Sequence, residues 1–257
     1  AQNRILLDHF LGNITEKIDA PRRSAVVYNP NGFPADGMVI LACPGEEKAA
    51  WIYDGEKKLP LQRLENGDLL FRAENVPAKG YKTFFLKEDS LDQEEFLSIS
   101  VYHMENRFFS IDINEKGQFS SIYDKRACRE LLKPGQCGNV IMTYEDRPHN
   151  YDAWDVNNYY VEKSWEAGAV ENICVIENGP VRARLRVERK YLDSRIVQYL
   201  SIYRDVPRID IDNEIDWREK QIFVKALFPV DIHSSEATFD IQYGNVKRPT
   251  HYNTSWD

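Results

Sequence analysis

The side chains whose types and spacing suit chemistry lie between Glu145 and Asp155 of this 257-residue chain. The segment reads Glu-Asp-Arg-Pro-His-Asn-Tyr-Asp-Ala-Trp-Asp, with four carboxylates, one guanidinium, one imidazole and two aromatic rings in eleven residues. Apolar packing groups are almost absent from it, so hydrophobic burial does not explain the sequence. Carboxylates accept hydrogen bonds from hydroxyls, and Tyr or Trp rings stack on the C–H face of a sugar. The pattern predicts either a sugar site or a solvated acidic loop.

Two of these carboxylates, Asp152 and Asp155, are also candidates for the acid pair of a glycoside hydrolase. Such a pair must lie roughly 5–9.5 Å apart across a cleft, which spacing within a loop does not establish. The sequence contains no GxSxG elbow, HExxH helix, Walker loop, dinucleotide fingerprint or kinase signature. It therefore indicates no other nucleophile and no phosphate-binding loop.

The histidines are scattered along the chain, and no two of them have metal-ligand spacing: His9, His103, His149, His233 and His251. His103 and His233 lie in or beside predicted strands, where a hydrogen-bonded structural role is expected. We therefore predict no tight metal site within the chain.

The elements that must position the acidic-aromatic segment begin with one helix. Apolar residues at helical spacing predict an amphipathic helix over residues 1–20, which Pro21 ends. Its apolar side either lies on a sheet or belongs to a helical bundle. Short β-rich runs then predict a small antiparallel β-sandwich over residues 21–87, followed by an acidic linker, 87–95. The runs are 24–28, 37–41, 50–53, 59–64, 68–73 and 81–86.

Two dipeptides in this first β region, Asp54-Gly55 and Asn66-Gly67, predict tight hairpins. In such a turn both central residues must accept a positive φ, which Gly, Asn and Asp tolerate best. We therefore expect strands to pair directly across both dipeptides.

A second β region over residues 96–257 contains longer strands, which favours a large antiparallel sandwich. Acids alternate with mostly apolar residues in 209–217, and Arg182, Arg184 and Arg186 alternate with apolar residues in 181–187. A calcium ion on the acidic row is disfavoured, because alternate strand residues lie about 6.8 Å apart. We expect a charged outer face on which arginines reach the acids if the strands form a meander. The expected strands are 108–113, 119–124, 174–177, 181–191, 196–203, 208–217 and 223–229.

The composition is that of an ordinary soluble protein, with 42% hydrophobic and 29% charged residues. A net charge of −8 argues against a nucleic-acid or anionic membrane partner, and no apolar run approaches the length of a membrane span. The cysteines lie far apart, which predicts reduced thiols in a cytoplasmic protein rather than disulfides or a zinc site: Cys43, Cys128, Cys137 and Cys174.

Several motifs, taken in order, resemble those of family 38 α-mannosidases of the intracellular bacterial, cytosolic and vacuolar branch. They are Glu145–Pro148, Tyr151–Asp155, Gly179–Arg184, Ile209–Trp217, Phe228–Asp231 and Arg248–Asp257. The resemblance is to the C-terminal β region and covers nearly the whole chain. It implies an all-β fold in which residues 1–20 are the last helix of a missing bundle and residues 21–87 a small β-sandwich. Residues 96–257 would be part of a large sandwich similar to galactose mutarotase, truncated at its C-terminus.

The function that the resemblance implies is that of a piece of a zinc-dependent, retaining α-mannosidase, which removes terminal α-mannosides in the cytoplasm. In that family the zinc ion and the aspartate nucleophile belong to an N-terminal barrel, and no residue here matches those motifs. The chain alone is therefore expected to be inactive, with no catalytic residue and no metal of its own. Its implied partners are the α-mannoside and the missing barrel and bundle, and a homo-oligomer is left open.

The β-domains of this family lend residues to the rim of the active site, which makes the acidic-aromatic segment the candidate for substrate contact. The candidate residues are Asp146, Arg147, Tyr151, Asp152, Trp154 and Asp155. The alternative for the same residues is a loop that docks a missing domain. In that case their aromatic rings have lost their cover, and Tyr151, Trp154, Tyr159 and Tyr160 are expected to be exposed or mobile.

Two other functions fit a β-sandwich of this size. One is a non-catalytic carbohydrate-binding module, and the other is a mutarotase-type sugar epimerase, which needs a histidine and an acid converging in a concave sheet. A barrel-encoding reading frame upstream of Ala1 would favour the mannosidase over both.

Overall fold

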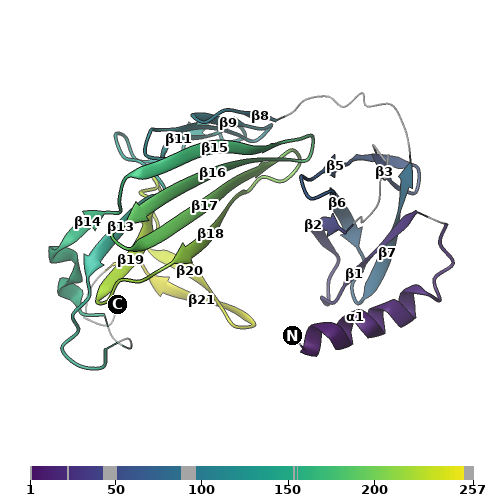
Figure 1. Ribbon diagram of the computed structural model, residues 1–257, viewed down its shortest axis with the longest axis horizontal. Helices are drawn as coiled ribbons and strands as arrows, with labels where there is room; N and C mark the ends of the chain where they lie inside the picture. Colours follow the sequence, from purple (N-terminus) through teal and green to yellow (C-terminus); the bar gives the residue numbers. More distant parts are fainter. Residues whose placement is uncertain are drawn as a thin grey trace. The chain divides into compact units, whose positions relative to one another are not determined.

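The described part of the chain consists mainly of antiparallel strands, as the computed structural model in Figure 1 shows. The structure describes residues 2–21, 23–42, 51–87, 97–152, 154 and 156–251. Among these residues there is one α-helix, α1 (Gln2–Thr15), and one 3-10 helix, η1 (Asn158–Glu162). The predicted all-β class with one N-terminal helix is therefore confirmed.

Two compact units divide the chain. The first consists of Ala1–Leu97 with two short pieces, Glu177–Ala183 and Tyr203–Asp205. The second consists of Ser98–Ile176, Arg184–Ile202 and Val206–Asp257. The predicted linker falls almost wholly at residues 88–95, outside the described residues.

Helix α1 of the first unit ends at Thr15, three residues before the last apolar residue of the predicted pattern, Ile18. The Thr15 hydroxyl donates a hydrogen bond of 2.7 Å to the Leu11 carbonyl and lies 2.8 Å from the Tyr28 hydroxyl. Most of the apolar side of the helix is exposed, including Ile5 and Phe10. Packing within the described part of the unit therefore does not explain its amphipathic sequence.

The first unit contains a small sandwich of two sheets that share one core. Phe71 of one sheet and Phe84 of the other are fully buried, and their ring centroids lie 5.2 Å apart. The four-stranded sheet has the order β1 (Ser24–Asn29), β7 (Gly80–Lys87), β3 (Trp51–Asp54), β4 (Lys57–Pro60). The three-stranded sheet has the order β2 (Ala35–Leu41), β6 (Leu69–Val76), β5 (Gln62–Arg63).

One predicted strand of this unit, residues 59–64, is wrong as a single element. It splits at the buried Leu61 into β4 and β5, which belong to different sheets. Both hairpins lie where they were predicted. Of the residues in the two dipeptides, however, Gly55 and Gly67 have a positive φ, whereas Asp54 and Asn66 do not. Asp54 is instead the last residue of β3 and pairs with Lys57, so the two-residue loop is Gly55-Glu56.

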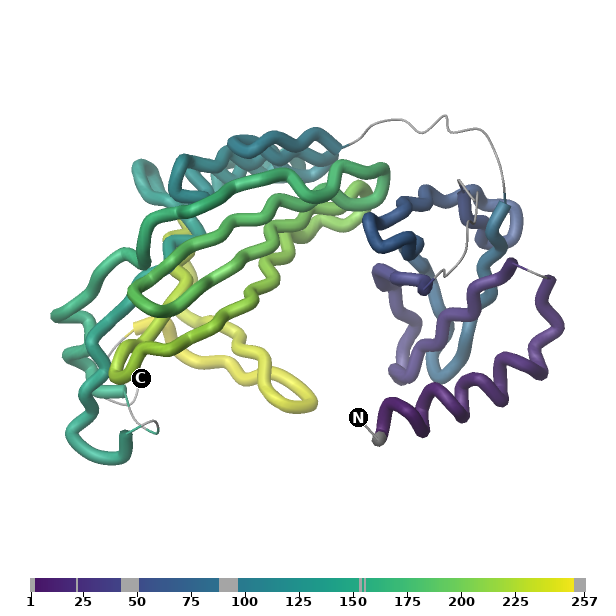
Figure 2. Tube along the Cα trace, viewed as in Figure 1, coloured from purple at the N-terminus to yellow at the C-terminus, as the bar shows by residue number. Residues whose placement is uncertain are grey.

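The second unit contains the longer strands in several sheets, which Figure 2 follows along the chain. The five-stranded sheet has the order β12 (Arg129–Glu130), β11 (Phe119–Asp124), β10 (Phe109–Ile113), β9 (His103–Glu105), β8 (Ser98–Ile99). The four-stranded sheet has the order β15 (Val170–Asn178), β16 (Arg182–Tyr191), β17 (Ser194–Tyr203), β18 (Ile209–Asp216). The three-stranded sheet has the order β14 (Ser164–Glu166), β13 (Val140–Glu145), β19 (Ile222–Leu227), and β20 (Glu236–Ile241) pairs with β21 (Gly244–Pro249).

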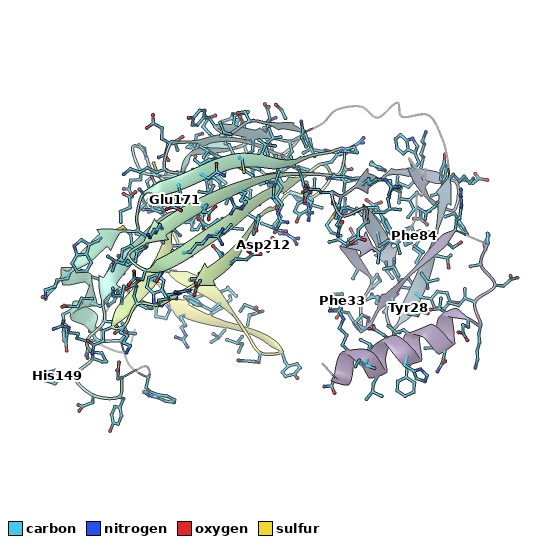
Figure 3. All side chains as sticks on the ribbon, in the orientation of Figure 1. Tyr28, Phe33, Phe84, His149, Glu171 and Asp212 are labelled. Carbon is cyan, nitrogen blue, oxygen red and sulfur yellow. The ribbon has the colours of Figure 1, made fainter. Side chains whose placement is uncertain are left out.

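The predicted charged face lies on the four-stranded sheet, where β17 separates the arginine row from the acidic row. A terminal nitrogen of Arg184 lies 2.8 Å from a carboxylate oxygen of Asp212, which Figure 3 labels. Arg184 also lies over the Tyr199 ring, 4.5 Å from its centroid. Arginine therefore reaches across one strand to the acids, as the meander predicted. In the described part of the chain, no helix has the length and apolar character needed to cross a membrane.

Candidate functional site

Strand β13 leads directly into the acidic-aromatic segment. It is the central strand of its sheet, and its last residues pair on both sides, Tyr144 with Ser164 of β14 and with Phe223 of β19. Beyond the strand the pairing continues for one more residue, because the backbone N–H of Asp146 donates a 2.8 Å hydrogen bond to the Gln221 carbonyl. The start of the segment is therefore fixed by the sheet rather than by burial of its own side chains.

A cluster of three aromatic rings and one ammonium group includes Tyr160, which lies just after the segment in sequence. Helix η1 places Tyr160 against the face of the sheet that carries Tyr144 and Phe223, with ring centroids 5.1 and 5.7 Å away in edge-to-face geometry. The Lys225 ammonium nitrogen lies 4.3 Å from the centroid of the Tyr160 ring and donates a hydrogen bond to its hydroxyl. The same nitrogen lies 5.3 and 5.8 Å from the centroids of Phe223 and Tyr144. Cation–π and aromatic contacts together hold Tyr160 in place.

Glu145 at the end of β13 is paired with two cations. One of its oxygens lies 2.8 Å from the Lys163 ammonium and the other 3.3 Å from the Arg147 guanidinium. The hydrogen bond from Lys163 is the main cause that lowers the pKa of Glu145 below its ordinary value, with a further contribution from the charge of Arg147. Glu145 is therefore an ionised, occupied carboxylate at neutral pH.

A pocket of about 220 Å³ lies between the start of the segment and the residues that follow the segment. Residues 145–148 line one side, and Asn157, Tyr159, Tyr160, Glu162 and Lys163 line the other. Three carboxylates and two cations thus border it, together with two phenol rings and one amide. This mixture of hydrogen-bonding groups and ring faces suits a polar ligand with an apolar face.

The turn between the two sides of the pocket projects into solvent. Tyr151 is 76% exposed and Trp154 is 87% exposed, and Asp152 is also exposed. The turn closes through a 2.8 Å hydrogen bond from the Trp154 N–H to the Tyr151 carbonyl, with Tyr151 at a φ of 58°. Figure 3 labels His149 at the start of this turn. The turn therefore presents an indole and a phenol ring that no described residue covers.

The structure brings together only part of the predicted site. Asp146 and Arg147 line the pocket, whereas Tyr151, Asp152 and Trp154 are on the exposed turn and do not line it. Asp155 lies outside the described residues, so its separation from Asp152 is not compared with that of a glycosidase pair.

The exposure predicted for the aromatic rings is confirmed for three of them and wrong for the fourth. Tyr159 is 48% exposed, like the more exposed Tyr151 and Trp154. Tyr160 is partly buried instead, because it packs on Tyr144 and Phe223 of its own unit. One half of the segment is thus anchored and the other half is not.

Several pocket residues were not among the predicted ones. Asn157, Glu162 and Lys163 lie after the motif that drew attention. Lys225 does not line the pocket but contacts Tyr160, which does, and it lies on β19, more than sixty residues along the chain. The alternation of Phe223 and Lys225 on a predicted strand placed them on one face, but nothing in the sequence paired that face with Tyr160. In the fold, the register of β13 and β19 places Phe223 beside Tyr144, and the Tyr160 ring packs on both.

Of the two histidines predicted to have a structural hydrogen-bonded role, His103 has it, whereas His233 is exposed and has no side-chain hydrogen bond to the described residues. The ring nitrogens of His103 lie 2.8 Å from an Asp112 oxygen and 3.2 Å from a Glu105 oxygen. The contact with Asp112 is the main cause that raises the pKa of His103. The zinc ion of the resembled family has no fitting donor set here: the described residues contain no group of three or more His, Cys, Asp or Glu side chains that could hold a metal.

Comparison with known proteins gives one family match. Residues 104–257 match the family described as Glycosyl hydrolases family 38 C-terminal domain. The matched range includes the whole of the pocket and the exposed turn.

Characterised relatives are named as α-mannosidases. The chain is 34% identical over 161 residues to Alpha-mannosidase G of Dictyostelium discoideum and 31% identical over 159 residues to Alpha-mannosidase 2C1 of Homo sapiens. Each alignment covers 60% of this chain and 15% of the relative. Alpha-mannosidase of Saccharomyces cerevisiae is 31% identical over 127 residues, 46% of this chain and 12% of that protein. The chain thus aligns with about one seventh of the length of these relatives.

Proposed function

Because the chain belongs to glycosyl hydrolase family 38, we propose that it forms the β-rich part of an α-mannosidase and borders the site where an α-mannoside binds. The observation that carries the proposal is that the family match covers the segment with the pocket, together with the α-mannosidase names of the similar proteins. The hydrolytic centre itself, with its zinc ion and retaining chemistry, would lie in a part of the polypeptide outside this sequence. The cytoplasm is the proposed location.

Under this proposal the acidic-aromatic segment contacts the substrate from the side of the β-domain. The carboxylates of Asp146, Asp152 and Asp155 would accept hydrogen bonds from sugar hydroxyls, and the Arg147 guanidinium would donate them. Tyr151 and Trp154 would stack on sugar C–H faces. This role would explain their exposure, because rings this exposed add little to the stability of the chain. None of these groups would form or break the glycosidic bond.

The test compares the chain alone with a longer polypeptide that joins it to the zinc-binding part. The purified chain is expected to release no phenol from an aryl α-mannoside, with or without added zinc, because it lacks a nucleophile–metal arrangement among its described residues. The longer polypeptide is expected to hydrolyse the α-mannoside and to leave the matching aryl β-mannoside intact.

Two results would contradict the proposal. Turnover by the chain alone that survives repurification would refute its non-catalytic role. A longer polypeptide that is folded and zinc-loaded but lacks α-mannosidase activity would refute the function itself, and binding of sugar without hydrolysis would then favour the carbohydrate-binding alternative.

A further inference from the structure

We propose that His103 forms a pH-sensitive contact that holds the edge of the five-stranded sheet, and that this edge loosens as the pH rises. Strand β9, which carries His103, lies between the edge strand β8 and strand β10. Strands β8 and β9 have only two and three residues, so this edge is expected to open more readily than the long strands β16 and β17. The property belongs to the fold of the second unit and does not depend on the proposed α-mannoside site.

The two ring nitrogens of His103 each face a carboxylate. The Nδ1 atom lies 2.8 Å from Oδ1 of Asp112, which pairs with His103 across β9 and β10, and Nε2 lies 3.2 Å from Oε2 of Glu105. A neutral imidazole has one N–H group and one lone pair, so it donates to only one acid and turns its lone pair toward the other. The imidazolium ion donates to both acids at once. The geometry therefore matches the protonated ring.

The neighbouring strands add one lysine and one further acid to this face of the sheet. Lys125, which follows β11, donates a hydrogen bond to the second oxygen of Glu105. That bond is the main cause that lowers the pKa of Glu105, with a further contribution from the bond with His103. Glu130 of β12 is occupied instead by the Ser121 hydroxyl and by backbone N–H groups. Glu105 therefore stays ionised when His103 loses its proton.

Deprotonation of His103 removes at least one of its two hydrogen bonds. The bond with Asp112 is the main cause that raises the pKa of His103 above its ordinary value of 6.5, and the bond with Glu105 adds to the rise. Because the pKa is raised in the closed edge, the stabilisation is fully present below pH 6.5 and is lost as the pH rises through the pKa of folded His103. Met104 between the two polar residues of β9 is fully buried, so the edge loosens without leaving the core.

The experiment follows the full 257-residue chain from about pH 5.5 to 8.5 at constant ionic strength. Proton NMR of the imidazole ring gives the pKa of His103. Hydrogen exchange gives the protection factors of the β8 and β9 amides, in which the intrinsic rise of exchange with pH is divided out. Linkage ties the two measurements together. Over the whole titration, protection should fall about tenfold for each unit by which the pKa of His103 in the closed edge exceeds its pKa in the open edge.

Three variants separate His103 from other titrating groups. His103→Gln is expected to make the protection of β8 and β9 independent of pH, because its amide donates to one acid at every pH. Asp112→Asn is expected to lower the pKa of His103 and to reduce the fall in protection by the corresponding factor. The matched control is His233→Gln, an exposed histidine of the same unit, which should leave both measurements unchanged. The thermal unfolding midpoint checks the folding of every variant, and Asp112→Asn keeps the test decisive if His103→Gln does not fold.

Three results would overturn the proposal. The first is a folded His103 that titrates at or below its ordinary pKa. The second is a protection factor of β8 and β9 that stays constant while His103 titrates. The third is a fall in protection that persists in His103→Gln, because another group would then cause it. None of these measurements uses a sugar or needs hydrolysis, so their failure leaves the α-mannosidase assay of the longer polypeptide unaffected.

Discussion

Two turns of this chain differ in how they are held, although both are polar and both lie within motifs of the family. The turn Gly179–Arg182 is packed against Gln62 inside the first unit. The turn Tyr151–Trp154 of the second unit is exposed, and its rings contact no described core. The difference separates residues whose identity is explained by folding from residues whose identity is not.

In the packed turn, the backbone N–H groups and the Arg182 side chain have hydrogen-bond partners. The Gln62 side-chain oxygen accepts hydrogen bonds from the backbone N–H groups of Val181 and Arg182, at 3.1 and 2.7 Å. The Arg182 guanidinium donates two bonds to the Glu177 carboxylate, at 2.8 and 2.7 Å. Gln62 and Arg182 are both buried, so these bonds satisfy groups that solvent does not reach. Folding alone accounts for this motif.

In the exposed turn, the same reasoning leaves the aromatic residues unexplained. An indole that is 87% exposed gains little from folding, and a cluster of exposed rings favours association. The contrast therefore favours contact of the exposed turn with a group beyond the described residues, and the proposed function supplies such a group.

Disrupting the packed turn is expected to give the largest loss of stability among these substitutions. A Cβ atom at Gly179 would lie 2.2 Å from the Gln62 side-chain carbonyl carbon, so Gly179→Ala must displace that amide. Displacement breaks two hydrogen bonds to buried N–H groups, which is expected to lower the free energy of unfolding by about 2–4 kcal/mol. The measurement is urea unfolding of the first unit.

Gly37→Ala is the control for this prediction, because nothing lies within 4 Å of the position that its Cβ would take and its strand is in the same unit. A Gly179→Ala variant as stable as Gly37→Ala would show that Gln62 can rearrange without loss.

Removing the Lys225 ammonium group, which holds Tyr160 at the pocket, is expected to give the second-largest loss of stability. Lys225→Met keeps the length of the side chain but loses the hydrogen bond to Tyr160 and the cation–π contacts. The expected loss of stability is about 1–2 kcal/mol, since the ammonium group is partly buried against three rings. Thermal unfolding measures it, with the exposed Lys220→Met as the control. Equal midpoints for the two variants would mean that aromatic packing alone positions Tyr160.

The sequence predicted most of the fold because its strands alternate strongly. The runs at 181–191 and 196–203 became β16 and β17 with small shifts at their ends, and the arginine and acidic rows met as expected. Strand β13, residues 140–145, was missed, although it positions the site. Within this strand, Ile141 and Thr143 are buried on one face of the sheet and Tyr144 on the other. The strand therefore lacks the alternation of polar and apolar residues that marks a half-exposed strand.

The site was predicted only in part for a similar reason. A run of acids and aromatic residues identifies a segment by its composition. Composition was enough to predict Asp146 and Arg147, which line the pocket. It does not show which residues across a sheet face the same pocket, because register between β13 and β19 is a long-range property. Asn157 and Lys225 are ordinary residues in sequence. Asn157 gains a role because it lines the pocket with Asp146, and Lys225 because it donates a hydrogen bond to Tyr160.

The stability of a Glu145 variant measured across pH tests how the start of the segment is held, in contrast to its exposed turn. Lys163 and Arg147 lower the pKa of Glu145, so the folded state holds the ionised form more strongly than the unfolded chain does. The stabilisation is present above the ordinary pKa of 4.5 and is lost as the pH falls through the lower folded value. Glu145→Gln is therefore expected to reduce the thermal midpoint slightly at pH 7 and not at the lowest pH that keeps the chain folded. High salt is expected to shrink the difference, and a constant difference across pH would assign the effect to shape rather than charge.

The exposed turn is expected to give the smallest effect on stability. Trp154→Ala removes a ring that is 87% exposed and leaves the backbone bond between Trp154 and Tyr151 in place, so the free energy of unfolding should change by no more than about 0.5 kcal/mol. Urea unfolding of the second unit checks this value against Lys225→Met, which removes the contact of β19 with Tyr160. In the longer polypeptide the same substitution is expected to lower kcat/KM for α-mannosides, because the ring would contact substrate there. A Trp154→Ala chain destabilised as much as Lys225→Met would show that the indole serves folding, and the contrast between the two turns would no longer assign it to substrate.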